Sequence, residues 1–202
     1  MSKYTISLYL EIVKILCYNL SNMSLETYKP TYETKEYKPL EDPIILETSR
    51  EDILAVETTF DDPELHELAA NNSVALNQGE IAIDRINSLE TRKDGYAFKI
   101  LRAEEGSDSH VAGVVYVIKK GLDFRTVELA YYTDEDEQGR GVMGASVAAV
   151  GAHFNQTKDI KFEIHNNNEA SIRVARKLGA AALGADGDHM NYYVSRGKIK
   201  TD

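Results

Sequence analysis

The sequence has one cysteine, Cys17, and this scarcity limits both its redox chemistry and its metal chemistry. A single thiol excludes a disulfide within the chain and any site built from several cysteines. Cys17 lies among apolar neighbours with no histidine nearby, so we expect it to pack rather than to react. The five histidines show neither metal-binding spacing nor an evident acidic partner, and we predict no metal. A reducing cytoplasm is the expected location.

Basic residues are also few. The chain has 23 lysines and arginines against 33 aspartates and glutamates, which gives a formal net charge of -10. No basic stripe offsets this charge, so we expect no binding to DNA, RNA or anionic lipid. The charge weakly favours a cationic or amine-bearing partner, although solubility alone explains it about as well. With 202 residues and 43% hydrophobic content, the chain can bury a full core.

No hydrophobic run is long enough to span a membrane. Residues 6–20 are apolar, but Glu11 and Lys14 interrupt them and no small-residue cleavage site follows. We expect a helix that packs on a surface or against a partner, a homodimer being one arrangement. Met23 is an alternative start of the protein, and the sequence leaves that choice open.

Two copies of Tyr-Lys-Pro, at residues 28–30 and 37–39, precede the regular part of the chain. Prolines amid charged residues favour an extended arm. We therefore predict an N-terminal helix and arm over residues 1–42 and one domain over residues 43–202.

Past Pro43 the hydrophobic pattern becomes regular. Thr48 or Ser49 is a suitable cap for a helix carrying Ile53, Leu54, Val56 and Phe60, and residues 81–89 repeat apolar positions at helical spacing. Three apolar segments with short links then predict an antiparallel meander. We predict strands over 44–46, 96–103, 111–118, 126–133, 160–164 and 189–195, and helices over 142–154 and 169–178, the latter closed by Gly179. The class is mixed α/β with a largely antiparallel sheet.

A glycine-bearing turn joins the strand at 126–133 to the helix at 142–154. Its sequence is Gln138-Gly139-Arg140-Gly141-Val142-Met143-Gly144. The first N–H groups of a helix lack carbonyl partners, and their partial positive charge suits a phosphate or pyrophosphate. We interpret the acidic run before the turn, residues 134–137, as a solvent-facing loop.

These elements and motifs resemble the GNAT superfamily of N-acetyltransferases, and within it the Rim-type ribosomal-protein N-terminal acetyltransferases. The resemblance covers about residues 43–197. It depends on the glycine-bearing turn after Glu128-Leu129-Ala130-Tyr131 and on Asn168-Glu169-Ala170-Ser171 at the start of a helix. The superfamily pattern is Gln or Arg, two residues, Gly, one residue, then Gly or Ala. Gln138 and Gly141 fit this pattern, and Met143 at its last position is common in the Rim-type branch.

Two other positions depart from that branch. Ala130 stands where the Rim-type branch has glycine, and Gly179-Ala180 replaces the Gly-Phe of that branch. The second departure affects the wall expected for the acceptor pocket.

The resemblance implies helices on both faces of the sheet and a cleft for acetyl-CoA between two strands that splay apart. The end of the strand would pair with the pantetheine arm and the turn would hold the pyrophosphate. Arg140 could instead be a solvated turn residue, and Tyr132 could instead be a packing residue. The cofactor-binding residues implied are Tyr131, Tyr132, Thr133, Gln138, Gly139, Arg140, Gly141, Val142, Met143, Gly144, Asn168 and Ser171.

Acetyl transfer needs a neutral amine, a stabilised oxyanion and a proton for the leaving thiolate. Glu128 is the first candidate for the base, because a glutamate within an apolar strand needs a reason; a buried ion pair is the alternative, and Glu163 is a weaker candidate. Ser171 is the candidate donor to the thiolate, by the family's Asn-x-x-Ser pattern. Asn168 and Ser171 are also ordinary helix-start residues.

The sequence thus indicates an N-acetyltransferase that moves acetyl from acetyl-CoA to a primary amine by direct attack in a ternary complex. The alternative is a GNAT-like module that binds acyl-CoA or a protein partner without turnover. The acceptor stays open among protein N-termini, lysine side chains and small-molecule amines, since acceptor loops carry no readable code.

Overall fold

The computed structural model describes residues 40–65, 67–68, 95–104, 108–120 and 125–199. Cys17, residues 6–20, the proline-bearing arm and the helix predicted at 81–89 lie outside these ranges. The proposed division at residue 42 therefore stays a prediction.

A single eight-stranded sheet organises the described chain, in the order β1-β2-β3-β4-β5-β6-β8-β7. All neighbouring strands are antiparallel except β5 and β6, which are parallel. This mixed, largely antiparallel sheet confirms the predicted class. The strands are β1 (Ile45–Glu47), β2 (Ile53–Thr58), β3 (Gly95–Arg102), β4 (His110–Lys120), β5 (Thr126–Thr133), β6 (Asp159–His165), β7 (Ala181–Asp186) and β8 (His189–Val194).

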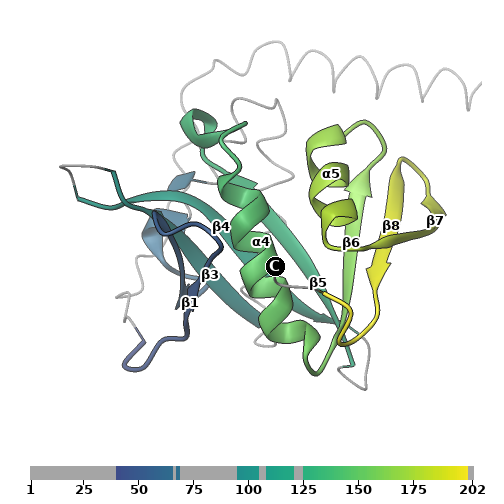
Figure 1. Ribbon diagram of the computed structural model, residues 1–202, viewed down its shortest axis with the longest axis horizontal. Helices are drawn as coiled ribbons and strands as arrows, with labels where there is room; N and C mark the ends of the chain where they lie inside the picture. The colour runs from purple at the N-terminus through teal and green to yellow at the C-terminus, as the bar shows by residue number, and fades with distance from the viewer. Residues whose placement is uncertain (1–39, 66, 69–94, 105–107, 121–124, 200–202) are drawn as a thin grey trace, which may run out of the picture. The chain divides into compact units, whose positions relative to one another are not determined.

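Two helices cover one face of this sheet. Helix α4 (Val142–Asn155) crosses the central strands, and α5 (Glu169–Lys177) lies over β6 (Figure 1). Met143, Val147, Val150 and Phe154 recur at helical spacing on α4 and join the core cluster that includes β3, β5 and β6. In the described part of the chain, no helix is long and apolar enough to cross a membrane.

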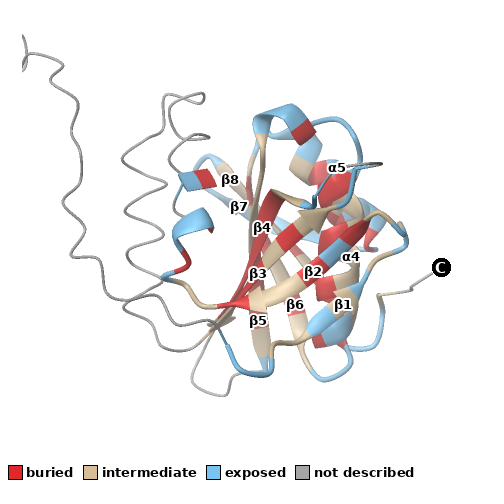
Figure 2. Ribbon diagram, turned by 90° about the vertical axis from the view of Figure 1, so that its left-hand side faces the viewer, coloured by how far each residue is buried: buried red, intermediate tan, exposed pale blue. Residues whose placement is uncertain are grey.

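The opposite face has its own core, which includes a short helical segment at residues 63–65 and 67–68. Strand β4 contributes to both faces, and its residues are red along most of their length in Figure 2. Burial on both faces explains why its sequence is a continuous apolar run rather than an alternating one. The buried members of this second cluster are Leu65, Leu68, Ala97, Val114, Tyr116 and Ile118.

The helix predicted after Thr48 is wrong, because this segment is strand β2. Ile53 and Ala55 are buried while Leu54 between them is exposed, which is the two-residue period of a strand. Apolar residues at 53, 54 and 56 fit a helical period as well, and pairing with β3 decides between the two. The Thr48 hydroxyl accepts a hydrogen bond from the Arg50 amide at 3.1 Å, so it closes a turn between β1 and β2 instead of capping a helix.

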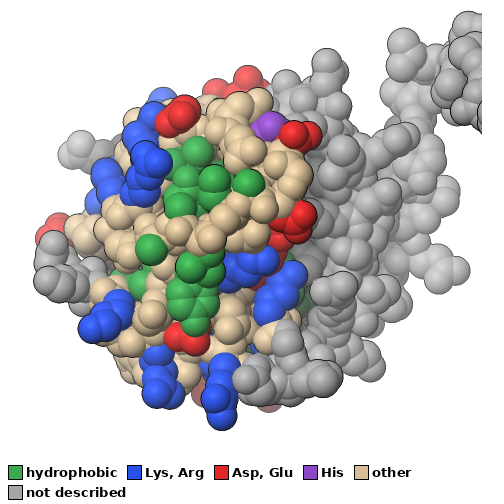
Figure 3. Space-filling view, turned by 90° about the vertical axis from the view of Figure 1, so that its right-hand side faces the viewer, with side chains coloured by type: hydrophobic (Ala, Val, Ile, Leu, Met, Phe, Trp, Pro, Cys, Tyr) green, Lys and Arg blue, Asp and Glu red, His purple; other side chains and the backbone are tan. Residues whose placement is uncertain are grey.

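Strand β7, which the sequence did not predict, forms one edge of the sheet. All six of its residues are exposed, and Leu183 is 67% exposed. The sequence Ala-Ala-Leu-Gly-Ala-Asp carries no alternation of apolar and polar residues, so pattern alone does not reveal this strand. On this side of the molecule, hydrophobic side chains lie among lysines and arginines (Figure 3).

Asp62 is a buried carboxylate at the start of the helical segment, and its ionisation should make folding depend on pH. Thr58 Oγ1 donates to it at 2.7 Å, the Glu64 amide donates at 3.0 Å, and Lys99 Nζ lies 3.1 Å away. Burial alone would raise the pKa of Asp62, but these donors outweigh it and hold that pKa below its ordinary value.

We predict that Asp62→Asn lowers the free energy of unfolding at neutral pH by roughly 1–3 kcal/mol, because it removes a buried hydrogen-bonded charge. A depressed folded-state pKa adds stability above the ordinary value of 3.8, and this stability is lost as pH falls through the folded-state value. Urea unfolding from pH 7 to pH 2 should therefore show the variant and wild type converging in strong acid. The exposed Asp186→Asn is the control, and a constant difference at every pH would contradict this account.

Candidate functional site

The parallel strands β5 and β6 diverge shortly after they begin. Their register holds three pairs, from Thr126 with Asp159 to Glu128 with Lys161. Strand β5 runs on to Thr133, paired with β4 along its whole length. Residues 129–133 thus have a sheet partner on one side only within the described chain. Such an unpaired strand edge inside a sheet can accept an extended ligand as an added strand.

A tight turn follows the open end of β5. The short 3₁₀ helix η1 (Glu135–Glu137) begins it, capped by the Asp134 side chain, which accepts from the Asp136 amide. Gly139 and Gly141 then adopt φ of 75° and 78°, a left-handed conformation that glycine reaches without a Cβ clash. A Cβ at Gly139 or at Gly144 would meet no described atom within 4 Å, so the backbone there is open to a ligand.

Within the described residues, the first turn of α4 presents backbone donors that have no acceptor. Gly141 is the N-cap and offers no side-chain acceptor. The first intrahelical bond in this turn runs from the Ala145 amide to the Gly141 carbonyl at 3.2 Å, so the amides of residues 142–144 precede it and lack helical acceptors. The side chains of Val142 and Met143 are buried. Only their backbone groups can therefore contact a ligand.

Glu137 overturns the expectation that the acidic run faces solvent. Glu135 and Asp136 are exposed, but Glu137 is only 3% exposed. Arg102 Nη1 donates to its Oε2 at 2.6 Å, and His110 Nε2 lies 3.0 Å from its Oε1. Burial would raise the pKa of Glu137, but these partners outweigh burial and lower that pKa. His110 therefore does have an acidic partner, distant in sequence.

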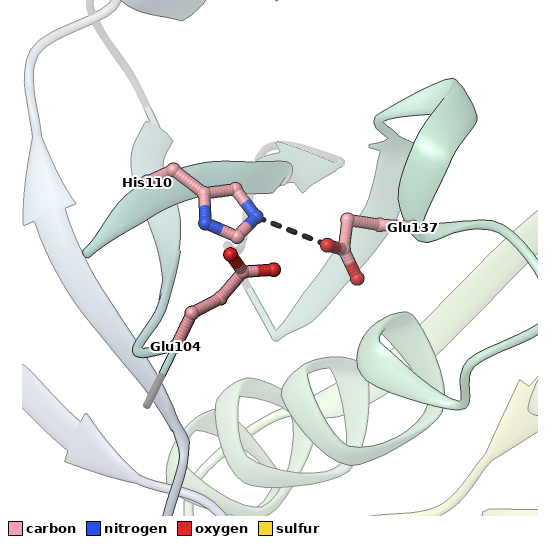
Figure 4. Close-up of side chains that lie close together, drawn as sticks. All are labelled: Glu104, His110 and Glu137. Atoms are coloured by element: carbon pink, nitrogen blue, oxygen red, sulfur yellow. Dashed lines mark hydrogen bonds and ion pairs between the residues drawn. The ribbon is translucent and has the colours of Figure 1, made fainter. Parts of the chain in front are cut away.

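Glu104 joins this pair to form a converging cluster (Figure 4). The possible ligand atoms of Glu104, His110 and Glu137 lie within 4.8 Å of one another. The guanidinium of Arg102 already occupies the second oxygen of Glu137, and a divalent cation would lie close to that positive charge. The Arg102–Glu137 ion pair and the His110–Glu137 contact fix η1, and they favour a structural role for Glu137 over a metal site.

Arg50 reaches this turn from the hairpin between β1 and β2. Its Nη1 donates to the Arg140 carbonyl at 2.6 Å, and its Nε and Nη2 donate to the two oxygens of Asp52 at 2.9 and 2.6 Å. The sequence prediction missed Arg50, which is 90 residues from Arg140 and lay in a segment predicted to be helical. Arg140 itself is on the turn, with Nη1 3.8 Å from Glu137 Oε1.

Glu128 and Glu163 lie near the point where the strands part. Glu128 belongs to the last β5–β6 pair and is 3% exposed. Lys120 Nζ lies 3.1 Å from its Oε2, yet that oxygen makes no well-directed hydrogen bond within the described residues. Glu163 is half-buried on β6, with Lys161 Nζ 3.6 Å from its Oε2.

The first turn of α5 lies against the open end of β5. Asn168 caps this helix, since its Oδ1 accepts from the Ser171 amide at 3.1 Å. The hydroxyl of Tyr131 donates to the Ser171 carbonyl at 3.4 Å. Burial raises the pKa of Tyr131 despite this bond. The hydroxyl of Tyr131 and the residue Ser171 thus come together although they are 40 positions apart.

Tyr132 has its ring on the opposite face of the sheet, where it packs edge-on against Tyr116 with ring centroids 6.4 Å apart. Tyr131 and Tyr132 are adjacent in a strand and so project to opposite faces. If Tyr132 contacts the same ligand as Tyr131, it does so through its backbone.

Solved acetyltransferases share this fold at low identity. RimL, a ribosomal L7/L12 alpha-N-protein acetyltransferase in complex with coenzyme A, matches with a TM-score of 0.59 at 20% identity over 79% of this chain and 100% of that one. The ribosomal-protein-S5-alanine acetyltransferase of Vibrio fischeri matches with a TM-score of 0.58 at 16% identity, covering 78% and 99%. A chimera of spermidine N-acetyltransferase SpeG from Vibrio cholerae and hSSAT gives 0.57 at 13%, covering 73% and 97%.

No curated protein sequence matches the chain. The family described as "Acetyltransferase (GNAT) domain" matches residues 44–181. That span includes the diverging strands, the glycine-bearing turn and both helices that follow. The chain therefore belongs to the GNAT acetyltransferase family.

Proposed function

We propose that this protein transfers the acetyl group of acetyl-CoA to a primary amine by direct attack in a ternary complex. One juxtaposition carries the proposal: the unpaired edge of β5 leads directly into a turn whose helix presents free amides. A ligand with an extended amide-bearing arm and a pyrophosphate at its end matches both features. Membership of the GNAT family supports acetyl-CoA as that ligand.

The donor would lie along β5. The amides of its pantetheine arm would pair with the backbone of Tyr131, Tyr132 and Thr133. Its pyrophosphate would accept hydrogen bonds from backbone amides between Gln138 and Gly144, where the helix dipole favours negative charge. Open space at Gly139 and Gly144 supports close approach of the phosphates.

The amine must lose a proton to attack the thioester carbonyl. We propose Glu128 as the acceptor of that proton, directly or through water, because it is a buried carboxylate at the root of the gap. One of its oxygens has no good hydrogen bond among the described residues. Glu163 is the second candidate, on the facing strand and more exposed. A backbone amide along residues 129–133 would stabilise the tetrahedral oxyanion.

Collapse of the tetrahedral intermediate breaks the carbon–sulfur bond, and the thiolate then takes up a proton. We propose the Ser171 hydroxyl as the donor, in the first turn of α5 where the helix dipole stabilises negative charge. The Tyr131 hydroxyl, which donates to the Ser171 carbonyl, would support this position. Asn168 would fix the turn by capping it.

A second function, binding acyl-CoA without turnover, has one specific observation in its favour. Glu128 is buried and lies 3.1 Å from the ammonium of Lys120. Such an ion pair is sufficient reason for a buried glutamate. In that case the cleft would hold a donor and no base would reach an amine.

We predict acetyl transfer to at least one amine in a panel of peptides with free N-termini, lysine peptides and polyamines, measured as CoA release and product mass. Glu128→Gln should lower kcat by roughly 100-fold or more while leaving acetyl-CoA binding intact, because a general base contributes about 10²–10⁴. Glu163→Gln is the matched comparison. Loss of turnover in Glu163→Gln alone would assign the role of general base to Glu163. No turnover by wild type across the panel would contradict the proposed acetyltransferase activity.

Gly141→Asp should abolish detectable acetyl-CoA binding in titration calorimetry. The substitution strains a left-handed position and adds negative charge where the pyrophosphate would lie. Gly187→Asp is the control, because Gly187 also has a left-handed φ, of 57°, in the turn between β7 and β8. Unchanged acetyl-CoA binding in Gly141→Asp would place the pyrophosphate elsewhere.

A further inference from the structure

Arg50 is held beside the glycine-bearing turn by a closed ring of interactions. Asp52 binds Arg50 on one side and Arg102 Nε on the other, at 3.2 Å. Arg102 in turn binds Glu137, which belongs to η1. The Arg140 carbonyl, three residues further along the turn, accepts from Arg50 and closes the ring. Segments from β1–β2, β3 and the turn are thereby fixed relative to one another.

The guanidinium of Arg50 has N–H donors that no described residue uses. Arginine has five N–H donors in a rigid fork. Three are used, by the two oxygens of Asp52 and by the Arg140 carbonyl. One N–H on each terminal nitrogen has no partner within the described residues, and the side chain is 33% exposed.

The Nη1 end of this guanidinium lies at the start of α4. A Cβ built on Gly141 would have Arg50 Nη1 as its nearest neighbour, at 3.9 Å. Gly141 is the N-cap of α4, directly before the free amides of residues 142–144. The guanidinium and the helix start thus approach the same space from different elements.

We infer that Arg50 is a further binding residue for the pyrophosphate of the acyl-CoA donor, and that Arg102 and Glu137 are positioning residues that orient it. The inference rests on the proposed function. The amides of α4 supply partial charges, and Arg50 adds a fixed guanidinium whose fork suits phosphate oxygens. Because contacts with Asp52 and the Arg140 carbonyl already fix the guanidinium, little side-chain entropy is lost when the donor binds.

A consequence is selectivity for donors that carry the pyrophosphate. Pantetheine shares the arm that would pair with β5 but has no phosphate. Loss of Arg50 should therefore weaken the binding of CoA and leave the binding of pantetheine unchanged. A general disturbance of the fold would instead weaken both.

Calorimetric titration with CoA and with pantetheine tests this inference on the full chain. Arg50→Gln should raise the Kd for CoA roughly 10- to 100-fold, the range for a lost hydrogen bond to a charged group, with pantetheine binding unchanged. Arg50→Lys keeps the charge and loses the fork, so its Kd for CoA should lie between those of wild type and Arg50→Gln. Glu137→Gln should weaken CoA selectively but less, and the exposed Arg176→Gln on α5 is the matched control.

Two results would overturn the inference: an unchanged Kd for CoA in Arg50→Gln, or equal weakening of CoA and pantetheine in both Arg50 variants. Binding is measured without turnover. A wild type that binds CoA but acetylates no amine would therefore contradict the proposed enzymatic activity, and the binding role of Arg50 could still be tested. A wild type that binds no CoA would contradict both.

Discussion

The early end of the pairing between β5 and β6 is the constraint on which the site depends. In most sheets, neighbouring strands satisfy one another's backbone groups to their ends, because an unpaired buried amide or carbonyl is costly. Here pairing stops at Glu128 and Lys161 while both strands continue. Pairing of β5 with β4 up to Thr133, and packing of α4 on the same strands, hold β5 in the sheet beyond its last pair with β6. The unpaired edge is thus a stable feature that a ligand can complete.

The second constraint is a set of ion pairs that holds the glycine-bearing turn in place. A turn with two left-handed glycines is flexible in isolation, and the free amides of α4 bind an anion well only if the turn is already in place. The ring of Arg50, Asp52, Arg102 and Glu137 supplies this order through three different segments. Burying Glu137 would be unfavourable alone, and its partners offset that cost. An acidic residue beside the proposed pyrophosphate site is thereby neutralised locally, so the acidic run does not conflict with that proposal.

Local signals in the sequence were sufficient for the part of the site that is contiguous. The apolar strand ending at Thr133, the glycines of the turn and the Asn168 cap each have short-range causes, and β5, α4 and α5 were predicted close to their observed bounds. Strand β2 was misread, since its apolar residues fit two periods and only pairing with β3 decides. Arg50 and the burial of Glu137 could not be predicted, because their partners come from other segments and no local pattern indicates them. Strand β7 has neither burial nor alternation to reveal it.

Amide hydrogen exchange with and without acetyl-CoA is the sharpest test of the proposed donor site, because it reports on the backbone groups proposed to bind the donor. Binding should slow exchange in residues 129–133 and 138–144, where a new acceptor or an ordered phosphate would replace water. Exchange in the edge strand β7 should not change. Acetyl-CoA that binds without protecting either segment, or that protects a different part of the sheet, would contradict the proposal that the donor binds along the unpaired edge of β5.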